Sequence, residues 1–201
     1  MGNVLPDHAA PDRETEAGRA RVYGLLSGLL ARPPDQGLLA RLAGLSGDGT
    51  ALGEAVGALA AAARDARAEA VEREFHDLFI GLGRGELLPY ASYYLTGFLH
   101  ERPLAKLRAD LAALGIERAA SVVEPEDHIA TLCEVMAGLI DGSLGDGPEQ
   151  DRRIFDRHLR PWAERFFADL EQAKAARFYR AVGRLGRVFI GIETEAFALP
   201  V

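Results

Sequence analysis

The chain has 201 residues, of which 48% are hydrophobic and 26% are charged, a balance typical of one globular domain with a substantial core. The formal net charge of -7 disfavours a nucleic-acid binder, because neutralising phosphates requires a dominant basic face. The charge is uneven, since residues 151–190 carry 10 Lys and Arg against 5 Asp and Glu. The acidic remainder can attract a basic peptide, and we expect no nucleic-acid partner.

The composition also indicates the cellular compartment of the protein. A single cysteine, Cys133, cannot form an intrachain disulfide, and the first residues lack a basic stretch followed by an apolar one. No segment approaches the ~18 consecutive apolar residues that a bilayer-spanning helix needs. We therefore expect a cytoplasmic protein without integral membrane contact.

The N-terminal part is predicted to be a tail followed by helices. Residues 1–12 contain two prolines and two aspartates, and we predict a flexible tail there. The remainder, 13–201, is predicted to form one all-helical domain. Leucines at helical spacing predict a first helix that ends before Pro33, and Asp35 is placed to cap a second.

The middle of the chain mixes strong and weak helical signals. An alanine-rich run, 51–70, has high helix propensity, and the apolar stripe after it ends in the glycines of 81–85, which read as a helix-ending turn. The segment 82–97 is the least helical by pattern, and a loop of this length in a compact domain is often functional. A leucine-rich helix then ends at Gly115, a residue that suits a helix C-terminus.

Further helices are predicted beyond a glycine-rich break. The break, 142–148, is a candidate hinge, which would permit a domain-swapped homodimer as well as a monomer. No segment shows the alternation of apolar and polar residues that is typical of strands. We predict an all-α bundle of about eight or nine helices with no sheet.

The stretch E-P-E-D-H-I-A-T-L-C-E-V-M, 124–136, begins a helix predicted over 125–140. On a helical wheel its apolar residues share one stripe, with Asp127, Thr131 and Glu134 opposite and His128 at the border. Pro125 suits a first helical turn, and acids favour the positive end of the helix dipole. A helix start of this kind is explained without any function.

Catalytic and metal-binding signals are weak. The five histidines lie in separate segments without metal-ligand spacing, and Cys133 falls on the apolar stripe. No G-x-S-x-G elbow and no P-loop are present. We predict no catalytic residue, no metal site and no cofactor, and therefore a protein that is not an enzyme.

Four arginines form a row in the last predicted helix. Arg177, Arg180, Arg184 and Arg187 follow at spacings of three, four and three, which places them on one helix face. Such a row could contact a phosphate or cofactor group, but it is also typical of the solvated face of an amphipathic helix. The first interpretation leaves a nucleotide-binding or nucleotide-hydrolysing enzyme as a less favoured alternative.

Several motifs follow one another in a fixed order. They are R-V-Y-G-L-L-S-G-L-L-A-R-P-P at 21–34, F-H-D-L-F-I-G-L-G at 75–83, L-P-Y-A-S-Y-Y-L at 88–95, E-P-E-D-H-I at 124–129 and R-H-L-R-P-W-A-E-R-F at 157–166. Together they resemble the TorD/DmsD family of redox-enzyme maturation chaperones, which proofread export by the Tat translocon. The resemblance covers nearly the whole chain.

The resemblance implies a cytoplasmic chaperone. It would bind the twin-arginine (Tat) signal peptide and the apo form of a molybdoenzyme catalytic subunit, assist molybdenum-cofactor insertion and prevent premature Tat export. Molybdenum-cofactor biosynthesis proteins are implied as further partners. The implied client is a formate dehydrogenase or a reductase of the trimethylamine-oxide or dimethyl-sulfoxide group. A nitrate-reductase assembly factor of the NarJ type is the alternative.

The resemblance also implies a signal-peptide site. Matched by position, its residues are Glu124, Pro125, Asp127, His128, Tyr90, Ser92 and Tyr93. We expect Asp127 to pair with an arginine or to organise the entrance of a groove, and His128 to pack at the groove edge and donate a hydrogen bond. Ala91 and Leu132 stand where the family often has glutamate, so client specificity is expected to differ.

Overall fold

The computed structural model describes residues 13–118, 124–145 and 149–199. Within these ranges the chain forms ten α-helices and two short π-helical segments, labelled η, and no strand. In chain order they are α1 (Arg13–Ala31), α2 (Gln36–Ala43), α3 (Ala51–Arg64), α4 (Ala68–Phe75), η1 (His76–Ile80), α5 (Ala91–Thr96), α6 (Arg102–Ala113), α7 (Ile129–Ile140), α8 (Gln150–Ile154), η2 (Phe155–Leu159), α9 (Ala163–Gln172) and α10 (Phe178–Ala198).

The predicted all-α class is confirmed, and the number of α-helices is higher than predicted because several of them are short. The alanine-rich run, for example, is divided between α3 and α4 rather than forming one helix. The predicted tail, 1–12, lies outside the described residues. None of the helices in the described ranges combines the length and the apolar character that crossing a membrane requires.

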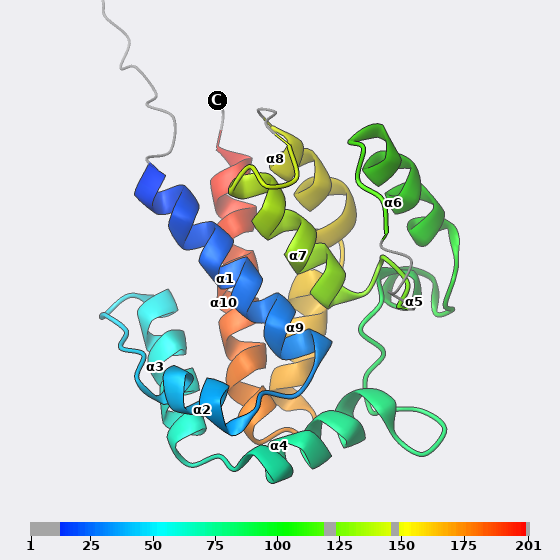
Figure 1. Cartoon of the computed structure of the whole chain (residues 1–201). Helices are drawn as coiled ribbons and strands as arrows, with labels where there is room; N and C mark the ends of the chain where they lie inside the picture. Colours follow the sequence, from blue (N-terminus) through cyan, green and yellow to red (C-terminus); the bar gives the residue numbers. More distant parts are fainter. Residues whose placement is uncertain (1–12, 119–123, 146–148, 200–201) are drawn as a thin grey trace, which may run out of the picture.

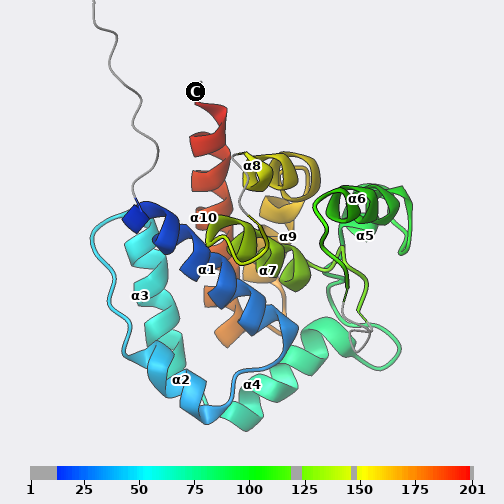
Figure 2. The ribbon, with the colours of Figure 1, turned by 45° about the horizontal axis from the view of Figure 1, so that its top comes forward.

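The core lies between the long helices. The N-terminal α1 packs against α7, and the C-terminal α10 packs against α9 and α3. Figures 1 and 2 show α2 and α3 on one side of these helices and α5 and α6 on the other. The largest fully buried side chains are aromatic and include Tyr23, Phe155, Trp162, Phe166 and Tyr179. Burial of such large apolar surfaces is the main stabilising contribution.

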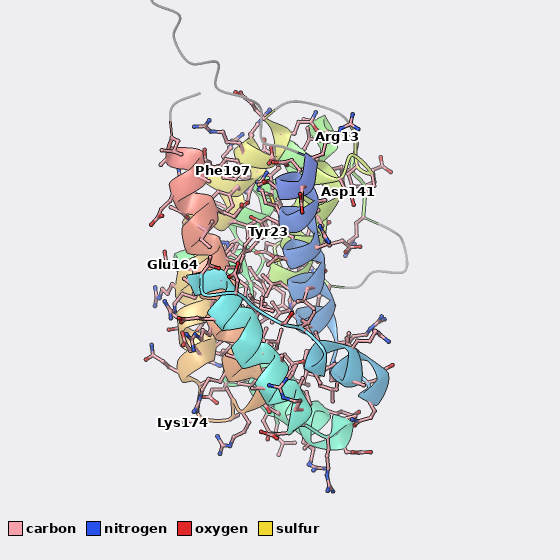
Figure 3. The ribbon with its side chains drawn as sticks, turned by 90° about the vertical axis from the view of Figure 1, so that its left-hand side faces the viewer. Arg13, Tyr23, Asp141, Glu164, Lys174 and Phe197 are labelled. Carbon is pink, nitrogen blue, oxygen red and sulfur yellow. The ribbon has the colours of Figure 1, made fainter. Side chains whose placement is uncertain are left out.

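A buried polar cluster joins α1 to α10. The guanidinium of Arg19 donates to both carboxylate oxygens of Glu193, each at 2.8 Å, and to Asp151 at 3.0 Å. Tyr23 donates its hydroxyl to Glu193 at 3.1 Å. Figure 3 shows Arg13 and Phe197 at the same end of the molecule, so α1 and α10 run antiparallel. The paired charges therefore fix the relative position of the first and last helices.

Two helix ends follow the sequence signals. Asp35 accepts the N–H of Leu38 at 2.7 Å and caps α2 as predicted. The glycines of 81–85 end η1, where Gly81 has φ 61 and donates its N–H to His76 at 2.7 Å. The prediction of a helix-ending turn at these glycines is confirmed, because a positive φ of this kind favours glycine.

Two other segments differ from the predictions. The segment 82–97 contains a helix, α5, in its second half, although the first half is irregular. The helix predicted over 125–140 begins only at Ile129, because residue 128 has extended backbone and pairs with residue 90. Of the candidate hinge, 142–145 form a turn and 146–148 lie outside the described residues.

Candidate functional site

The two sequence segments of the predicted site are joined by backbone hydrogen bonds. Tyr90 and His128 form an isolated antiparallel bridge. On one side of it Ile129 donates its N–H to Pro89 at 2.9 Å, and on the other Ala91 donates to Asp127 at 3.0 Å. The tyrosine-containing loop and the E-P-E-D-H segment, separate in sequence, therefore form one unit at the start of α7.

Asp127 is buried and holds α5. Its side chain is 1% exposed, and Oδ2 accepts the backbone N–H of Ser92, the second residue of α5, at 2.8 Å. The other oxygen, Oδ1, is buried without a hydrogen-bond partner among the described residues. Of the two roles expected for Asp127, this geometry fits that of organising the groove and does not offer the carboxylate to an arginine from outside.

His128 is the N-cap residue of α7 and is neutral at pH 7. Its Nδ1 accepts the N–H of Ala130 at 3.1 Å, so the ring serves as the N-cap. Burial lowers the pKa of His128 to about 4, although the carboxylates of Glu124 and Asp127 act in the opposite direction. Because Nδ1 is the acceptor, the proton of the neutral ring is on Nε2. The expected hydrogen-bond donor is therefore Nε2.

A groove of about 510 Å³ lies between α1, η1 and the start of α7. We call it the α1–α7 groove. Its wall is formed by Ser27, Leu30, Ala31, Phe75, Phe79, Ile80, Pro89, Tyr90, Glu124, His128, Ala130, Thr131 and Glu134. Aromatic and aliphatic side chains therefore make one side, and the side chains at the start of α7 make the other.

Two exposed carboxylates border this groove. Glu124 accepts the hydroxyl hydrogen bond of Tyr90, whose ring meets His128 edge-on at 5.0 Å. Glu134 lies one turn into α7 and makes no ion pair within the described part of the chain. Ile80, on the opposite wall, is 55% exposed. The groove thus combines negative charge with an uncovered apolar surface.

The remaining predicted residues divide into two groups. Ser92 is fully buried, and the carbonyl of Pro125 accepts the N–H of His128 at 3.1 Å. Both residues therefore support the backbone next to the groove. Tyr93, in contrast, lines another cavity, together with Tyr94 and Arg165. The structure brings Glu124, Tyr90 and His128 together in the groove and leaves Tyr93 outside it.

Sequence reasoning did not assign the apolar wall or Glu134 to the site. Phe75, Phe79 and Ile80 belong to the F-H-D-L-F-I-G-L-G motif, but their position across from His128 depends on how α4 and η1 pack, which no local pattern reveals. Glu134 was placed correctly on the polar face of α7. Leu132 is fully buried and Ala91 is 4% exposed, so the two departures from the family pattern add apolar residues to the interior.

The arginine row of α10 is occupied by contacts within the chain. Arg184 pairs with Glu54 at 3.2 Å and Arg187 with Glu171 at 2.8 Å. Arg177 and Arg180 each donate to the backbone carbonyl of Ala176. Arg177 and Arg180 also line a cavity of about 690 Å³ beside α4, so contact of the row with a phosphate or cofactor group stays a prediction.

A carboxylate already lies at the start of the same helix. Glu74, 9% exposed, accepts the backbone N–H groups of Arg177, Phe178 and Tyr179 at 2.7, 3.1 and 2.7 Å. A helix N-terminus attracts anions, but here a side chain of α4 fills that place. Among the described residues, no group of three or more His, Cys, Asp or Glu side chains could hold a metal ion.

Comparison with solved structures gives the class of fold. A crystal structure of a protein from Archaeoglobus fulgidus assigned to redox enzyme maturation matches with a TM-score of 0.61 over 93% of this chain and 99% of that one, at 18% sequence identity. The chain therefore has the all-helical fold of that protein.

Sequence comparison gives the family. A family model described as nitrate reductase delta subunit matches residues 46–168. Similar proteins are named chaperone protein TorD: that of Vibrio vulnificus is 34% identical over 68% of this chain and 69% of its own length, and that of Shewanella loihica is 28% identical over 89% and 92%. The TorD of Vibrio cholerae is 31% identical over 63% of this chain and 61% of its own length.

The chain belongs to the nitrate reductase delta subunit family, which confirms the resemblance to the TorD/DmsD chaperones. The chain spans about 61% of the length of the Vibrio cholerae relative. The relatives are named as chaperones, which supports the prediction that the chain is not an enzyme.

Proposed function

We propose that this chain is a cytoplasmic maturation chaperone that binds the twin-arginine signal peptide and the apo form of a molybdoenzyme catalytic subunit. The α1–α7 groove is the proposed peptide site. The observation that carries the proposal is the position of two exposed carboxylates, Glu124 and Glu134, in one groove with an exposed apolar residue, Ile80.

The chemistry of the groove matches that of the peptide. A twin-arginine leader presents two adjacent cations followed by an apolar run. Carboxylates form short, charge-assisted hydrogen bonds with guanidinium groups, and Tyr90 holds the Glu124 carboxylate in place by its hydroxyl. The aliphatic stems of the arginines can cover the rings of Phe75 and Phe79. A partner without the two cations would leave the carboxylates of the groove uncomplemented.

Buried groups would give the site its shape and direction. Asp127 and Ser92 fix α5 against the start of α7, so the groove is formed before the peptide arrives. The neutral His128 would donate from Nε2 to a carbonyl of the bound peptide. Recognition of an extended peptide commonly combines such backbone contacts with pockets for side chains.

The proposed binding would act on maturation in two ways. A leader held in the groove is withheld from the Tat translocon, and the apo subunit stays in the cytoplasm while its molybdenum cofactor is inserted. The cofactor is assigned to the client, and proteins of molybdenum-cofactor biosynthesis are the further partners proposed. The client is proposed to be a formate dehydrogenase or a reductase of the trimethylamine-oxide or dimethyl-sulfoxide group.

An assembly factor of the NarJ type is the second candidate function. It is favoured by the description of the matching family model, nitrate reductase delta subunit. Its client would belong to a membrane-attached complex rather than to a fully exported enzyme. Identification of the subunit that copurifies with this chain from its native cytoplasm would distinguish the two.

Titration with a fluorescent peptide tests the proposed function. The probe contains two adjacent arginines and an apolar run, and a matched peptide has both arginines replaced by glutamine. We expect the chain to bind the arginine peptide at least about tenfold more tightly at low salt, and the difference to shrink as ionic strength rises.

Paired variants test the site. Glu124→Gln/Glu134→Gln removes both carboxylates of the groove and should remove most of the preference for arginine. Glu69→Gln/Glu195→Gln removes two exposed carboxylates from other surfaces and should leave it intact. Equal loss in the two variants would contradict the site, since only overall charge would then matter. No preference for arginine in the unmodified chain would contradict the function.

A further inference from the structure

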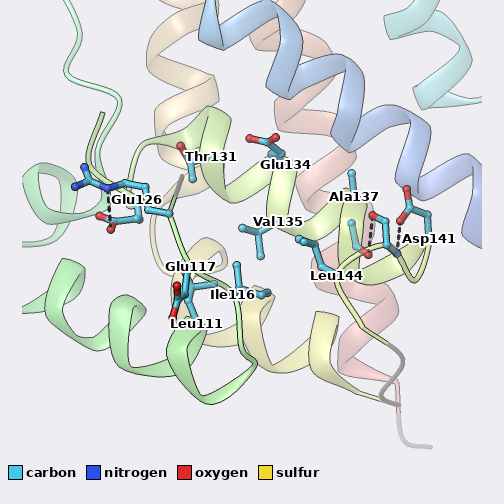
Figure 4. A pocket seen from close by; sticks show the side chains of 13 residues that line it. Leu111, Ile116, Glu117, Glu126, Thr131, Glu134, Val135, Ala137, Asp141 and Leu144 are labelled. Atoms are coloured by element: carbon cyan, nitrogen blue, oxygen red, sulfur yellow. Dashed lines mark hydrogen bonds and ion pairs between the residues drawn. The ribbon is translucent and has the colours of Figure 1, made fainter. Parts of the chain in front are cut away.

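A second cavity lies on the other side of α7. It has a volume of about 430 Å³ and is bounded by α6, residues 116–118, α7 and the turn at 141–145. We call it the α6–α7 pocket. Figure 4 shows Leu111, Ile116, Val135 and Leu144 around its centre, so its floor is apolar.

The rim of this pocket is acidic. Figure 4 shows Glu117, Glu126, Glu134 and Asp141 around the apolar centre. Glu126 is neutralised by Arg108 at 2.8 Å and Arg118 at 3.6 Å. Glu117 and Glu134 are exposed and make no ion pair within the described part of the chain. An occupant of this pocket is therefore apolar, with no negative charge at its edges.

The pocket adjoins the α1–α7 groove. Thr131 and Glu134 line both cavities. Side chains three positions apart on a helix lie about 5–6 Å from each other, and an extended chain advances about 3.3 Å per residue. A peptide that leaves the groove at Glu134 therefore needs only a few residues to reach the floor of the pocket.

The far wall of the pocket is held in place. Asp110 is adjacent to Leu111 in α6. Its carboxylate accepts hydrogen bonds from Arg153 at 3.0 Å and from Arg157 at 2.8 Å, and it contacts Nε2 of His158 at 2.7 Å. These contacts attach α6 to α8 and η2. The pocket is thus present in the chain without a partner, as is usual for binding sites of this size.

We propose that the α6–α7 pocket binds the apolar run of the same client peptide whose arginines occupy the α1–α7 groove. This inference rests on the proposed function. The apolar floor stabilises the run by burying it, and the acidic rim rejects acidic partners. The chain's own residues 1–12 do not fit, because they contain two aspartates and no Lys or Arg.

Two peptides separate the pocket from the groove. The long peptide has two arginines followed by about twelve leucine and alanine residues, the length of a leader's apolar region, and the short peptide ends soon after the arginines. The unmodified chain should bind the long peptide at least about tenfold more tightly than the short one, since one buried leucine already contributes that factor.

Pocket variants should abolish only the advantage of the long peptide. Ile116→Gln/Leu144→Gln replaces two half-buried side chains that line the pocket and not the groove. We expect it to lower the affinity for the long peptide about tenfold and to leave the affinity for the short peptide unchanged. The control Leu45→Gln, at another 39% exposed leucine, should change neither.

The outcomes distinguish the two proposals. If the unmodified chain binds neither peptide, the proposed function fails. If it binds both and the pocket variant binds the long peptide as tightly as the unmodified chain, the pocket inference is overturned and the function remains. If the pocket variant changes the oligomeric state in sedimentation instead of peptide affinity, a second copy is the occupant and the inference is also overturned.

Crosslinking gives a result that does not depend on variant folding. A benzophenone group in the apolar run of the long peptide is activated by light on the unmodified chain, and the attached residues are identified by mass spectrometry. Crosslinks to 111–118 or 135–144 support the inference. Crosslinks confined to 75–80 would place the apolar run in the groove and overturn it.

Discussion

Asp127 accepts the backbone N–H of Ser92 at 2.8 Å, although the two residues are 35 positions apart. This hydrogen bond caps α5 and makes the aspartate of the E-P-E-D-H motif an internal support of the groove. The motif and the tyrosine-containing loop are therefore one structural unit. In the proposed function the ionic contact with a client is assigned to the exposed Glu124 and Glu134.

Substitution of Asp127 should affect stability and peptide affinity together. Asp127→Ala removes the cap of α5, and we expect the free energy of unfolding to fall by about 1–2 kcal/mol. Asp127→Asn retains an oxygen that can accept from Ser92, so both properties should largely persist. Urea unfolding and peptide titration of the two variants provide the measurement.

The same two variants distinguish an ionic role of Asp127 from a supporting one. If Asp127 paired directly with an arginine of the client, Asp127→Asn would lose peptide affinity while the unfolding midpoint stayed close to that of the unmodified chain. That pattern would contradict a supporting role for the buried carboxylate.

The structure shows why local patterns predicted the helices better than the site. Leucine spacing and the capping residue Asp35 act within a few residues, so α1 and α2 follow from them. Pro125 and its neighbouring acids are equally good helix-start signals, yet α7 begins at Ile129 because His128 pairs with Tyr90 across the fold. Tertiary pairing overrides local propensity at this point.

The groove and the pocket depend on similarly distant contacts. Whether Asp127 is buried cannot be read from its own neighbours, since it depends on α5, a helix of six residues that is too short to show periodicity. The α6–α7 pocket exists because Asp110 docks α6 onto residues 153–158. Only the family resemblance grouped Glu124, Tyr90 and His128, which line one groove, and it also included Tyr93, which lies outside that groove.

The burial of His128 should make stability depend on pH. Its pKa is about 4 in the folded chain and about 6.5 in the unfolded chain. The unfolded state alone binds a proton between these values, so this contribution to stability is complete above pH 6.5 and is lost as pH falls to 4. The loss is about 3 kcal/mol.

Replacing His128 by a residue that caps α7 but does not titrate isolates the effect of the histidine's ionisation on stability. His128→Asn keeps an N-cap side chain and lacks the ionisation. Urea unfolding at pH 7, 5.5 and 4 gives the free energy of unfolding at each pH. Between pH 7 and pH 4 this free energy should fall by about 3 kcal/mol more in the unmodified chain than in the variant. Parallel pH profiles would show that His128 is not responsible.

Asp110 should be among the most sensitive positions for stability. Although its burial acts in the opposite direction, the hydrogen bond with His158 and the charges of Arg157 and Arg153 lower the pKa of Asp110. Asp110→Asn leaves these groups without their anion, and we expect a loss of about 3 kcal/mol in unfolding free energy. The exposed Asp77→Asn is the control and should cost less than about 0.5 kcal/mol. A similar small change at both positions would contradict this assignment.

The arginine row should be dispensable for the proposed function. Arg184 contacts Glu54 at the surface, and such pairs contribute about 0–1 kcal/mol to stability. Arg180→Ala/Arg184→Ala should therefore leave peptide affinity within about twofold. Binding of a fluorescent guanine nucleotide that disappears in this variant would instead support the nucleotide alternative.

Hydrogen exchange with and without a twin-arginine peptide tests the central claim most directly. We predict that saturating peptide slows exchange of backbone amides at 75–81, 90–92 and 128–134, which surround the α1–α7 groove, and leaves 177–187, at the start of α10, unchanged. Slowed exchange confined to 177–187, or no change in the groove segments with peptide bound, would contradict it.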